Sequence, residues 1–190
     1  MSDSTAALSQ VQLRAVAELL RTAPLVDELG RLFDEAGEEL YLVGGSVRDA
    51  LLGRLGNDLD FTTSAGPDRT EEILRRFSRS VWSIGKEFGT IGASRSAGGR
   101  EWVVEVTTFR ADAYSPDSRK PVVAFGDNIT DDLVRRDFTV NAMAVDVVNR
   151  VFVDPHGGLR DLAAGVLRTP SAPRVSFSDD PLRMMRAARF

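Results

Sequence analysis

The chain has 190 residues, a length that suits one domain, or one domain with part of another. Hydrophobic residues make up 43% of it and charged residues 27%, as in ordinary globular proteins. It has no cysteine and one histidine, His156, which excludes disulfides, thiolate metal sites and multi-histidine metal sites. A bound metal would therefore need oxygen ligands, which favours a hard cation such as Mg2+.

The ends of the chain carry two further signals. Residues 1–20 lack the basic start and apolar core of a signal peptide, and no apolar run is long enough to cross a membrane. We therefore expect a cytoplasmic protein with no membrane partner. The net charge of −4 argues weakly against a nucleic-acid partner, but arginines are concentrated between Arg168 and Arg189.

Apolar spacing and turn residues predict the elements in chain order. We expect helices over 6–21 and 25–37, a buried strand over 39–43, a helix over 46–53 and a strand over 58–63. The remaining predicted elements are a helix over 68–79, strands over 80–85, 89–94 and 100–109, a long polar loop over 111–129, a helix over 130–143, a hairpin of 144–148 with 150–154, a helix over 157–165, and a helix that begins at Ser178 and runs to the end of the chain. This order indicates an α/β (α+β) fold with a mixed sheet and helices on one face or at its ends.

Two aspartates in the segment DLDFTT, Asp58 and Asp60, are the first candidate site residues. On a strand, residues two apart point to the same face, so both carboxylates lie side by side while Leu59 and Phe61 point into the core. Two close carboxylates repel each other unless a cation lies between them. Taken alone, an Asp-x-Asp is more often a solvated pair on an exposed edge.

A Gly-Gly turn, Gly44 and Gly45, precedes this pair and opens a helix. Glycine lets a ligand approach the backbone, and the free N–H groups of a helix start favour an anion such as phosphate. Arg48 adds a positive charge nearby. Taken alone, the turn could be a plain tight turn with a surface arginine.

Together the two features resemble the signature of the polymerase-β-like nucleotidyltransferases, in which a Gly-Gly or Gly-Ser turn precedes Asp–apolar–Asp. Members of that superfamily use a third carboxylate on a neighbouring strand, and EWVVEVTTF offers Glu101 and Glu105. We favour Glu105, because a glutamate between Val104 and Val106 is costly unless it pairs or binds a metal. Three carboxylates suit two Mg2+ ions.

Four later segments narrow the resemblance: VEVTTFR (104–110), RRDFTVNAMA (135–144), DPHGG (154–158) and DDPLRMMRAARF (179–190). In this order they resemble the class II tRNA nucleotidyltransferases, the CCA-adding enzymes, and their relatives the bacterial poly(A) polymerases. The resemblance covers about residues 39–190. It implies a nucleotidyltransferase head domain over 39–170 and the start of a helical neck over 171–190 that is cut short. The N-terminal helices expected from apolar spacing occupy residues 1–38, before the resemblance begins.

The resemblance also implies roles for individual residues. Gly44, Gly45 and Arg48 would contact the triphosphate, Asp58 and Asp60 would bind magnesium, and Arg136 and Asp137 would contact the nucleotide and its ribose. The neck helix would read the incoming base through Asp179, Asp180, Arg183, Arg186 and Arg189. Asp179 stands where the family usually has glutamate, which weakens its assignment.

The hydrogen-bonding groups of this helix are suited to recognising the bases cytosine and adenine. Aspartate only accepts hydrogen bonds and arginine only donates them. Cytosine and adenine each present an amino donor beside a ring acceptor, whereas guanine and uracil present the reverse order. Asp180 and Arg183 can therefore accept CTP and ATP and reject the other two. The alternative is a surface ion pair between them.

The implied activity is addition of C and A to the tRNA 3′ end without a template. The head motifs do not separate this from poly(A) polymerase, or from enzymes that add only CC or only A. An alternative of another class is a non-catalytic nucleotide-binding module. The isolated chain is expected to be weakly active or inactive.

Overall fold

The computed structural model describes residues 10, 13, 16–17, 23, 25–113 and 122–190. Most of the helix expected over 6–21 therefore lies outside the described residues. Among those described, no helix combines the length and apolar character that a bilayer crossing requires.

A seven-stranded mixed sheet forms the centre of the molecule, in the order β3-β4-β5-β2-β1-β8-β9. Its strands are β1 (Leu40–Val43), β2 (Asp58–Thr63), β3 (Ser80–Trp82), β4 (Thr90–Ala97), β5 (Arg100–Thr108), β8 (Ala144–Asp146) and β9 (Val151–Val153). The pair β2–β5 is parallel and the other neighbouring pairs are antiparallel. The expected mixed α/β architecture is confirmed.

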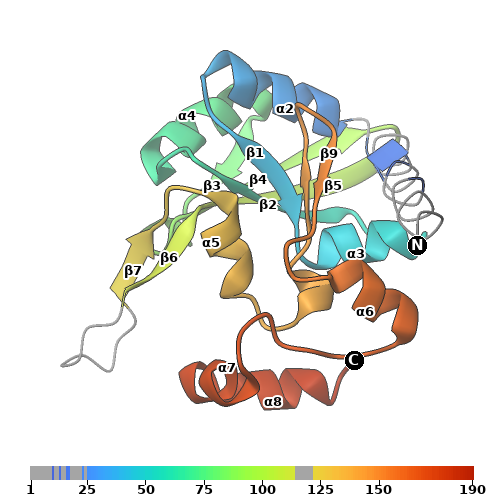
Figure 1. Ribbon diagram of the computed structural model, residues 1–190. Coiled ribbons are helices and arrows are strands. Elements are labelled where there is room, and N and C mark those ends of the chain that lie inside the picture. Colours follow the sequence, from blue (N-terminus) through green and yellow to red (C-terminus); the bar gives the residue numbers. More distant parts are fainter. Residues whose placement is uncertain (1–9, 11–12, 14–15, 18–22, 24, 114–121) are drawn as a thin grey trace.

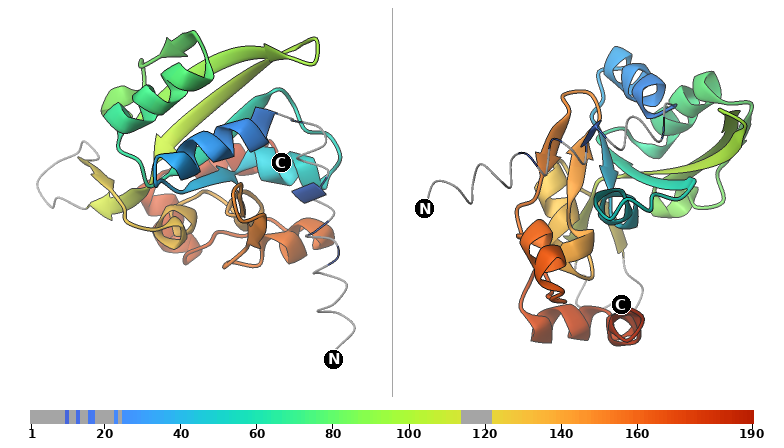
Figure 2. Two further views of the ribbon diagram at one scale, coloured as in Figure 1. Left: turned by 90° about the horizontal axis from the view of Figure 1, so that it is seen from above. Right: turned by 90° about the vertical axis from the view of Figure 1, so that its right-hand side faces the viewer.

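Helices α2 (Leu25–Glu35) and α4 (Pro67–Phe77) lie on one side of the sheet, and α7 (Pro173–Asp179) and α8 (Leu182–Ala187) lie on the opposite side of the molecule (Figures 1 and 2). The other helical elements are α3 (Gly45–Leu51), η1 (Lys86–Phe88), α5 (Ile129–Val134), η2 (Thr139–Asn141) and α6 (Gly158–Ala164).

Strand β1 separates two apolar clusters because its residues alternate in direction. Leu40 and Leu42 belong to the main core with α2 and α4, whereas Val43 packs with Leu133 of α5 in a smaller cluster. In β2, Leu59 and Phe61 belong to the main core. The opposite face of β2 is thereby left free for polar side chains.

Three sequence predictions were wrong in part. The segment expected as a loop over 111–129 contains strands β6 (Arg110–Ala113) and β7 (Val122–Phe125), which pair antiparallel and project from the sheet in Figure 1. The helix expected over 130–143 is interrupted, with α5 ending at Val134 and η2 beginning at Thr139. The break has a local cause, because the Asp137 carboxylate accepts the backbone N–H of Phe138 and competes with helical bonding.

The third correction concerns the helix expected from Ser178. Ser178 and Asp179 instead end α7, Asp180 is extended, and α8 begins at Leu182. Pro181 explains the break, because proline disfavours a helical conformation in the residue before it.

Candidate functional site

Neighbouring strands bring three carboxylates to one face of the sheet. In the parallel β2–β5 pair, Asp60 lies directly opposite Glu105 and Asp58 opposite Val103. Asp58, Asp60 and Glu105 are exposed, whereas the residues between them, such as Leu59 and Val104, are buried. Glu101 is engaged elsewhere, since its carboxylate accepts a hydrogen bond from Ser96. The arrangement that the sequence predicted for the three carboxylates is therefore present.

The pKa of Asp60 responds to both burial and the charges around it. Its carboxylate faces an open cleft, but the surrounding groups remove part of its hydration, and this burial raises its pKa. The negative charges of Glu105 and Asp58 raise the pKa further, whereas Arg136 lowers it. A cation between these carboxylates would relieve the repulsion. Among the described residues, no three or more acidic or histidine side chains are arranged closely enough to hold a metal ion as they stand.

The Gly-Gly turn lies next to the carboxylates. Gly44 follows β1 with φ +67° and ψ −135°, a conformation that only glycine adopts readily, and α3 begins at Gly45. A Cβ at position 44 would lie 2.9 Å from Nη1 of Arg136. Glycine here therefore serves two needs, the turn itself and the close approach of Arg136.

Ser46 joins the turn to the aspartates. Its buried hydroxyl accepts the backbone N–H of Asp60 at 3.0 Å and donates to the backbone carbonyl of Asp58 at 3.4 Å. Helix α3 and strand β2 are thus fixed relative to each other at the start of β2, which carries both aspartates.

Arg48 of α3 is held from two directions. Its guanidinium donates to both carboxylate oxygens of Asp49, at 3.0 and 3.1 Å, and to Oδ1 of Asn141 at 2.7 Å. It also stacks over the ring of Phe190, 5.1 Å from the centroid. Asn141 lies 93 residues away in sequence, and the sequence analysis did not identify it.

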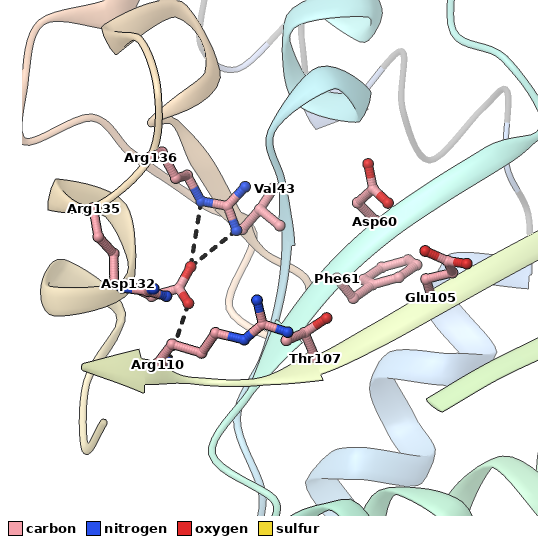
Figure 3. A pocket seen from close by; sticks show the side chains of 9 residues that line it. All are labelled: Val43, Asp60, Phe61, Glu105, Thr107, Arg110, Asp132, Arg135 and Arg136. Atoms are coloured by element: carbon pink, nitrogen blue, oxygen red, sulfur yellow. Dashed lines mark hydrogen bonds and ion pairs between the residues drawn. The ribbon is translucent and has the colours of Figure 1, made fainter. Parts of the chain in front are cut away.

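Arg136 is oriented by Asp132, a carboxylate that is only 4% exposed. Oδ2 of Asp132 accepts Nε and Nη2 of Arg136 at 3.3 and 2.9 Å, while Oδ1 accepts the backbone N–H of Arg110 at 3.2 Å. Figure 3 shows these contacts on one side of a pocket and Asp60 and Glu105 on the other. Asp132 was also missed from the sequence, where it reads as an ordinary acidic residue at a helix start.

Asp137 connects the sheet side of the cleft to α8. Its Oδ1 accepts Nδ2 of Asn141 at 2.9 Å, and its Oδ2 accepts Nε and Nη2 of Arg186 at 2.8 and 2.7 Å. Asn141 therefore links Asp137 to Arg48.

The remaining predicted residues lie on or before α8. Asp180 does not pair with Arg183 in the described structure; its Oδ1 accepts the backbone N–H of Leu182, and Arg183 donates to Oγ of buried Ser176 and to the carbonyl of Arg135, both at 2.6 Å. Asp180 and Arg183 line the cleft. Arg189 lines a neighbouring part of the cleft, and Asp179 is exposed at the end of α7.

Three adjoining pockets share Asp60 and together form one cleft. One side contains Gly44, Gly45 and Arg48 with the arginines of α8, and the other contains Glu105 with Arg110 and Arg135. The cleft thus combines a carboxylate cluster, a glycine turn and a strongly basic wall. Such a site can bind a polyanion together with divalent cations.

Comparison with known proteins agrees with this geometry. Residues 40–168 match the family model described as "Poly A polymerase head domain". The chain is 43% identical over 158 residues to the CCA-adding enzyme of Lactobacillus helveticus, covering 83% of this chain and 37% of that protein. It is 41% identical over 174 residues to the CCA-adding enzyme of Ligilactobacillus salivarius, covering 91% of this chain and 40% of that protein. The chain thus spans about two fifths of the length of these relatives.

Solved structures give the same result. The CCA-adding enzyme of Bacillus stearothermophilus in complex with CTP superposes with a TM-score of 0.74 at 34% identity, over 88% of this chain and 38% of that one. The Thermotoga maritima CCA-adding enzyme complexed with tRNA gives a TM-score of 0.70 at 33% identity, over 92% and 40% of the two chains. With its sheet, its cleft and these relatives in agreement, the chain belongs to the poly A polymerase head domain family, to which it is matched over most of its length.

Proposed function

We propose that the protein containing this chain adds C and A nucleotides to the 3′ end of tRNA without a template, using CTP and ATP and releasing pyrophosphate. The observation that carries the proposal is the cleft in which Asp60 lies beside both the Gly44–Gly45 turn and Glu105, with Asp58 on the same face of β2. Relatives named CCA-adding enzymes support this choice of substrates. Because the chain spans about two fifths of those relatives, the activity is proposed for the full-length protein.

The donor set in the cleft fits Mg2+. Carboxylate oxygens are its preferred protein ligands. Burial is the main cause of the raised pKa of Asp60, and the negative charges of Glu105 and Asp58, which a cation would offset, raise it further. Two Mg2+ ions held by Asp58, Asp60 and Glu105 would activate the attacking 3′-hydroxyl and neutralise the departing pyrophosphate.

The chain's own residues position the nucleotide. Arg48 and Arg136, each held by a neighbouring carboxylate, would bind the triphosphate beside the Gly44–Gly45 backbone. Asp137 would hold the ribose. Holding the reacting groups in place in this way is a large part of phosphoryl-transfer catalysis.

We assign recognition of the base to two residues: Asp180, which precedes α8, and Arg183, in the first turn of α8. Asp180 would accept the amino group shared by cytosine and adenine, and Arg183 would donate to the adjacent ring nitrogen. Arg183 is already oriented by Ser176 and the carbonyl of Arg135, which reduces the entropy lost on binding. Arg186 and Arg189 add positive charge along the same wall.

The decisive experiment incubates the full-length protein with Mg2+, a tRNA that lacks its 3′ CCA, and each nucleotide alone or CTP with ATP. Completion of CCA with the mixture, and no products from UTP or GTP, is expected. Long tails from ATP alone would indicate poly(A) polymerase, and arrest after CC or a requirement for a CC end would indicate the partial enzymes. Nucleotide binding without any transfer would contradict the proposal and indicate a binding module. Asp58→Asn serves as the inactive control.

A further inference from the structure

The pocket shown in Figure 3 is lined by Asp60 and Glu105 but by neither glycine of the turn, and it meets the turn only through Val43 and Arg136. Strand β2 lies between β1, which leads into Gly44, and β5, which carries Glu105. The pocket is lined by Arg110, Arg135 and Arg136 together with Thr107 and the acidic groups. None of the roles assigned above uses Arg110.

The chemistry of nucleotidyl transfer determines what enters this pocket. In an in-line displacement, the attacking oxygen and the leaving pyrophosphate lie on opposite sides of the reacting phosphorus. If the triphosphate lies beside Gly44 and Gly45, the 3′-hydroxyl must approach from the side of Glu105. The last nucleotide of the acceptor RNA then lies in the pocket that contains Arg110.

Arg110 has the properties of an anion ligand. Its Nη2 donates to the carbonyl of Phe88 at 2.5 Å and to Oγ1 of Thr90 at 3.4 Å, and Asp132 holds its backbone N–H. In the described part of the chain, its Nε is buried and has no hydrogen-bond partner. Burial lowers the pKa of Arg110, and the positive charges of Arg135 and Arg136 lower it further, whereas the negative charge of Asp132 partly offsets them. A cation placed among other cations gains from a bound anion.

Two exposed aromatic residues neighbour Arg110 through the backbone. Phe88, whose carbonyl accepts the Arg110 guanidinium, is 52% exposed, and Phe125, which pairs with Arg110 across the β6–β7 hairpin, is 49% exposed. Exposed rings next to a cation are typical of single-stranded nucleic-acid sites, where bases stack without being read. A growing 3′ end presents a different terminal base in successive rounds, so a site that holds phosphate and stacks bases suits it better than one that reads base edges.

We propose that Arg110 binds the phosphate of the 3′-terminal nucleotide of the acceptor RNA, with Phe88 and Phe125 stacking on its bases. The inference rests on the proposed transfer function. It assigns the acceptor to the Glu105 side of the cleft and adds Arg110 to the binding residues.

The test compares Arg110→Ala, Arg110→Lys and the control Arg76→Ala in the full-length protein. Arg76 lies on α4, where it pairs with Glu35 away from the cleft. Arg110→Ala is expected to raise KM for the tRNA about tenfold, leave KM for CTP unchanged, and lower the salt dependence of RNA binding by about 0.7 in logarithmic slope. Arg110→Lys keeps the charge and should retain most of the affinity. Arg76→Ala should match wild type, and melting curves verify that each variant is folded.

A second arm modifies the RNA. A neutral methylphosphonate at the last linkage of the acceptor should weaken wild-type binding, measured by fluorescence anisotropy, about as much as Arg110→Ala does. The same modification should cause no further loss in the variant. Independent, additive losses would overturn the proposal, as would an Arg110→Ala variant with a raised KM for CTP alone. Because anisotropy needs no turnover, a wild-type protein that binds RNA but transfers nothing would refute the proposed function while this arm still decides the role of Arg110.

Discussion

Replacing Gly44 with alanine should disturb both folding and nucleotide binding, for two separable reasons. At φ +67° and ψ −135°, a residue with a side chain is strained by about 1–3 kcal/mol. For a chain of this size, we expect Tm to fall by roughly 2–12 °C. In addition, the new Cβ would lie 2.9 Å from Nη1 of Arg136, which Asp132 prevents from moving freely.

Gly53 provides a matched control, because it also has φ +67° but has nothing within 4 Å of its virtual Cβ. Gly53→Ala should therefore lower Tm through its positive φ without affecting nucleotide binding. Circular dichroism melting and the KM for CTP measure the two effects. We expect Gly44→Ala to raise KM at least about tenfold, the loss of one well-placed charged hydrogen bond. If both variants gave the same KM, the idea that Gly44 makes room for Arg136 would be refuted.

Three further substitutions test other parts of the cleft and the fold. Asp60→Asn should abolish transfer. It should also raise Tm in the absence of Mg2+ by about 0.4–4 °C, because it removes a like-charge repulsion of about 0.2–1 kcal/mol; a lowered Tm would show that the repulsion is unimportant. Asp161→Ala removes the acceptor of the buried Thr139 hydroxyl and the ion-pair partner of Arg168. The free energy of unfolding, measured by denaturant titration, should therefore fall by about 1–3 kcal/mol, and an unchanged unfolding midpoint would contradict this. Asp180→Ala should lower the preference for CTP and ATP over UTP and GTP in incorporation assays before it abolishes transfer, whereas full selectivity would mean that another group reads the base.

The parts of the site that depend only on neighbouring residues could be predicted from the sequence. The alternation in DLDFTT places Asp58 and Asp60 on one face whatever the rest of the chain does, and the glycine turn is equally local. The flanking valines of Glu105 indicated its direction, and the register of β5 against β2 agrees. These features follow from the period of a strand and from backbone sterics.

The parts that sequence reasoning missed depend on distant partners. Asn141 and Asp132 matter because of the arginines they hold, and nothing in their own neighbourhoods signals those contacts. The helix expected over 130–143 has suitable apolar spacing but is broken at Asp137, whose carboxylate binds backbone and Arg186 instead. The pairing of β6 with β7 likewise brings together residues separated by the segment 114–121.

The contacts from Arg48 through Asn141 and Asp137 to Arg186 join the two ends of the cleft. In a templated polymerase, the width of a base pair fixes where an incoming base must lie relative to its phosphates. Under the proposed function no base pair is available. These four hydrogen-bonded side chains would instead fix the distance between Arg48, at the triphosphate, and Arg186, near the base. A nucleotide is then accepted only when its triphosphate and its base fit the two ends at once, so lengthening or shortening any one of the four side chains changes fidelity even where no contact with the base is lost.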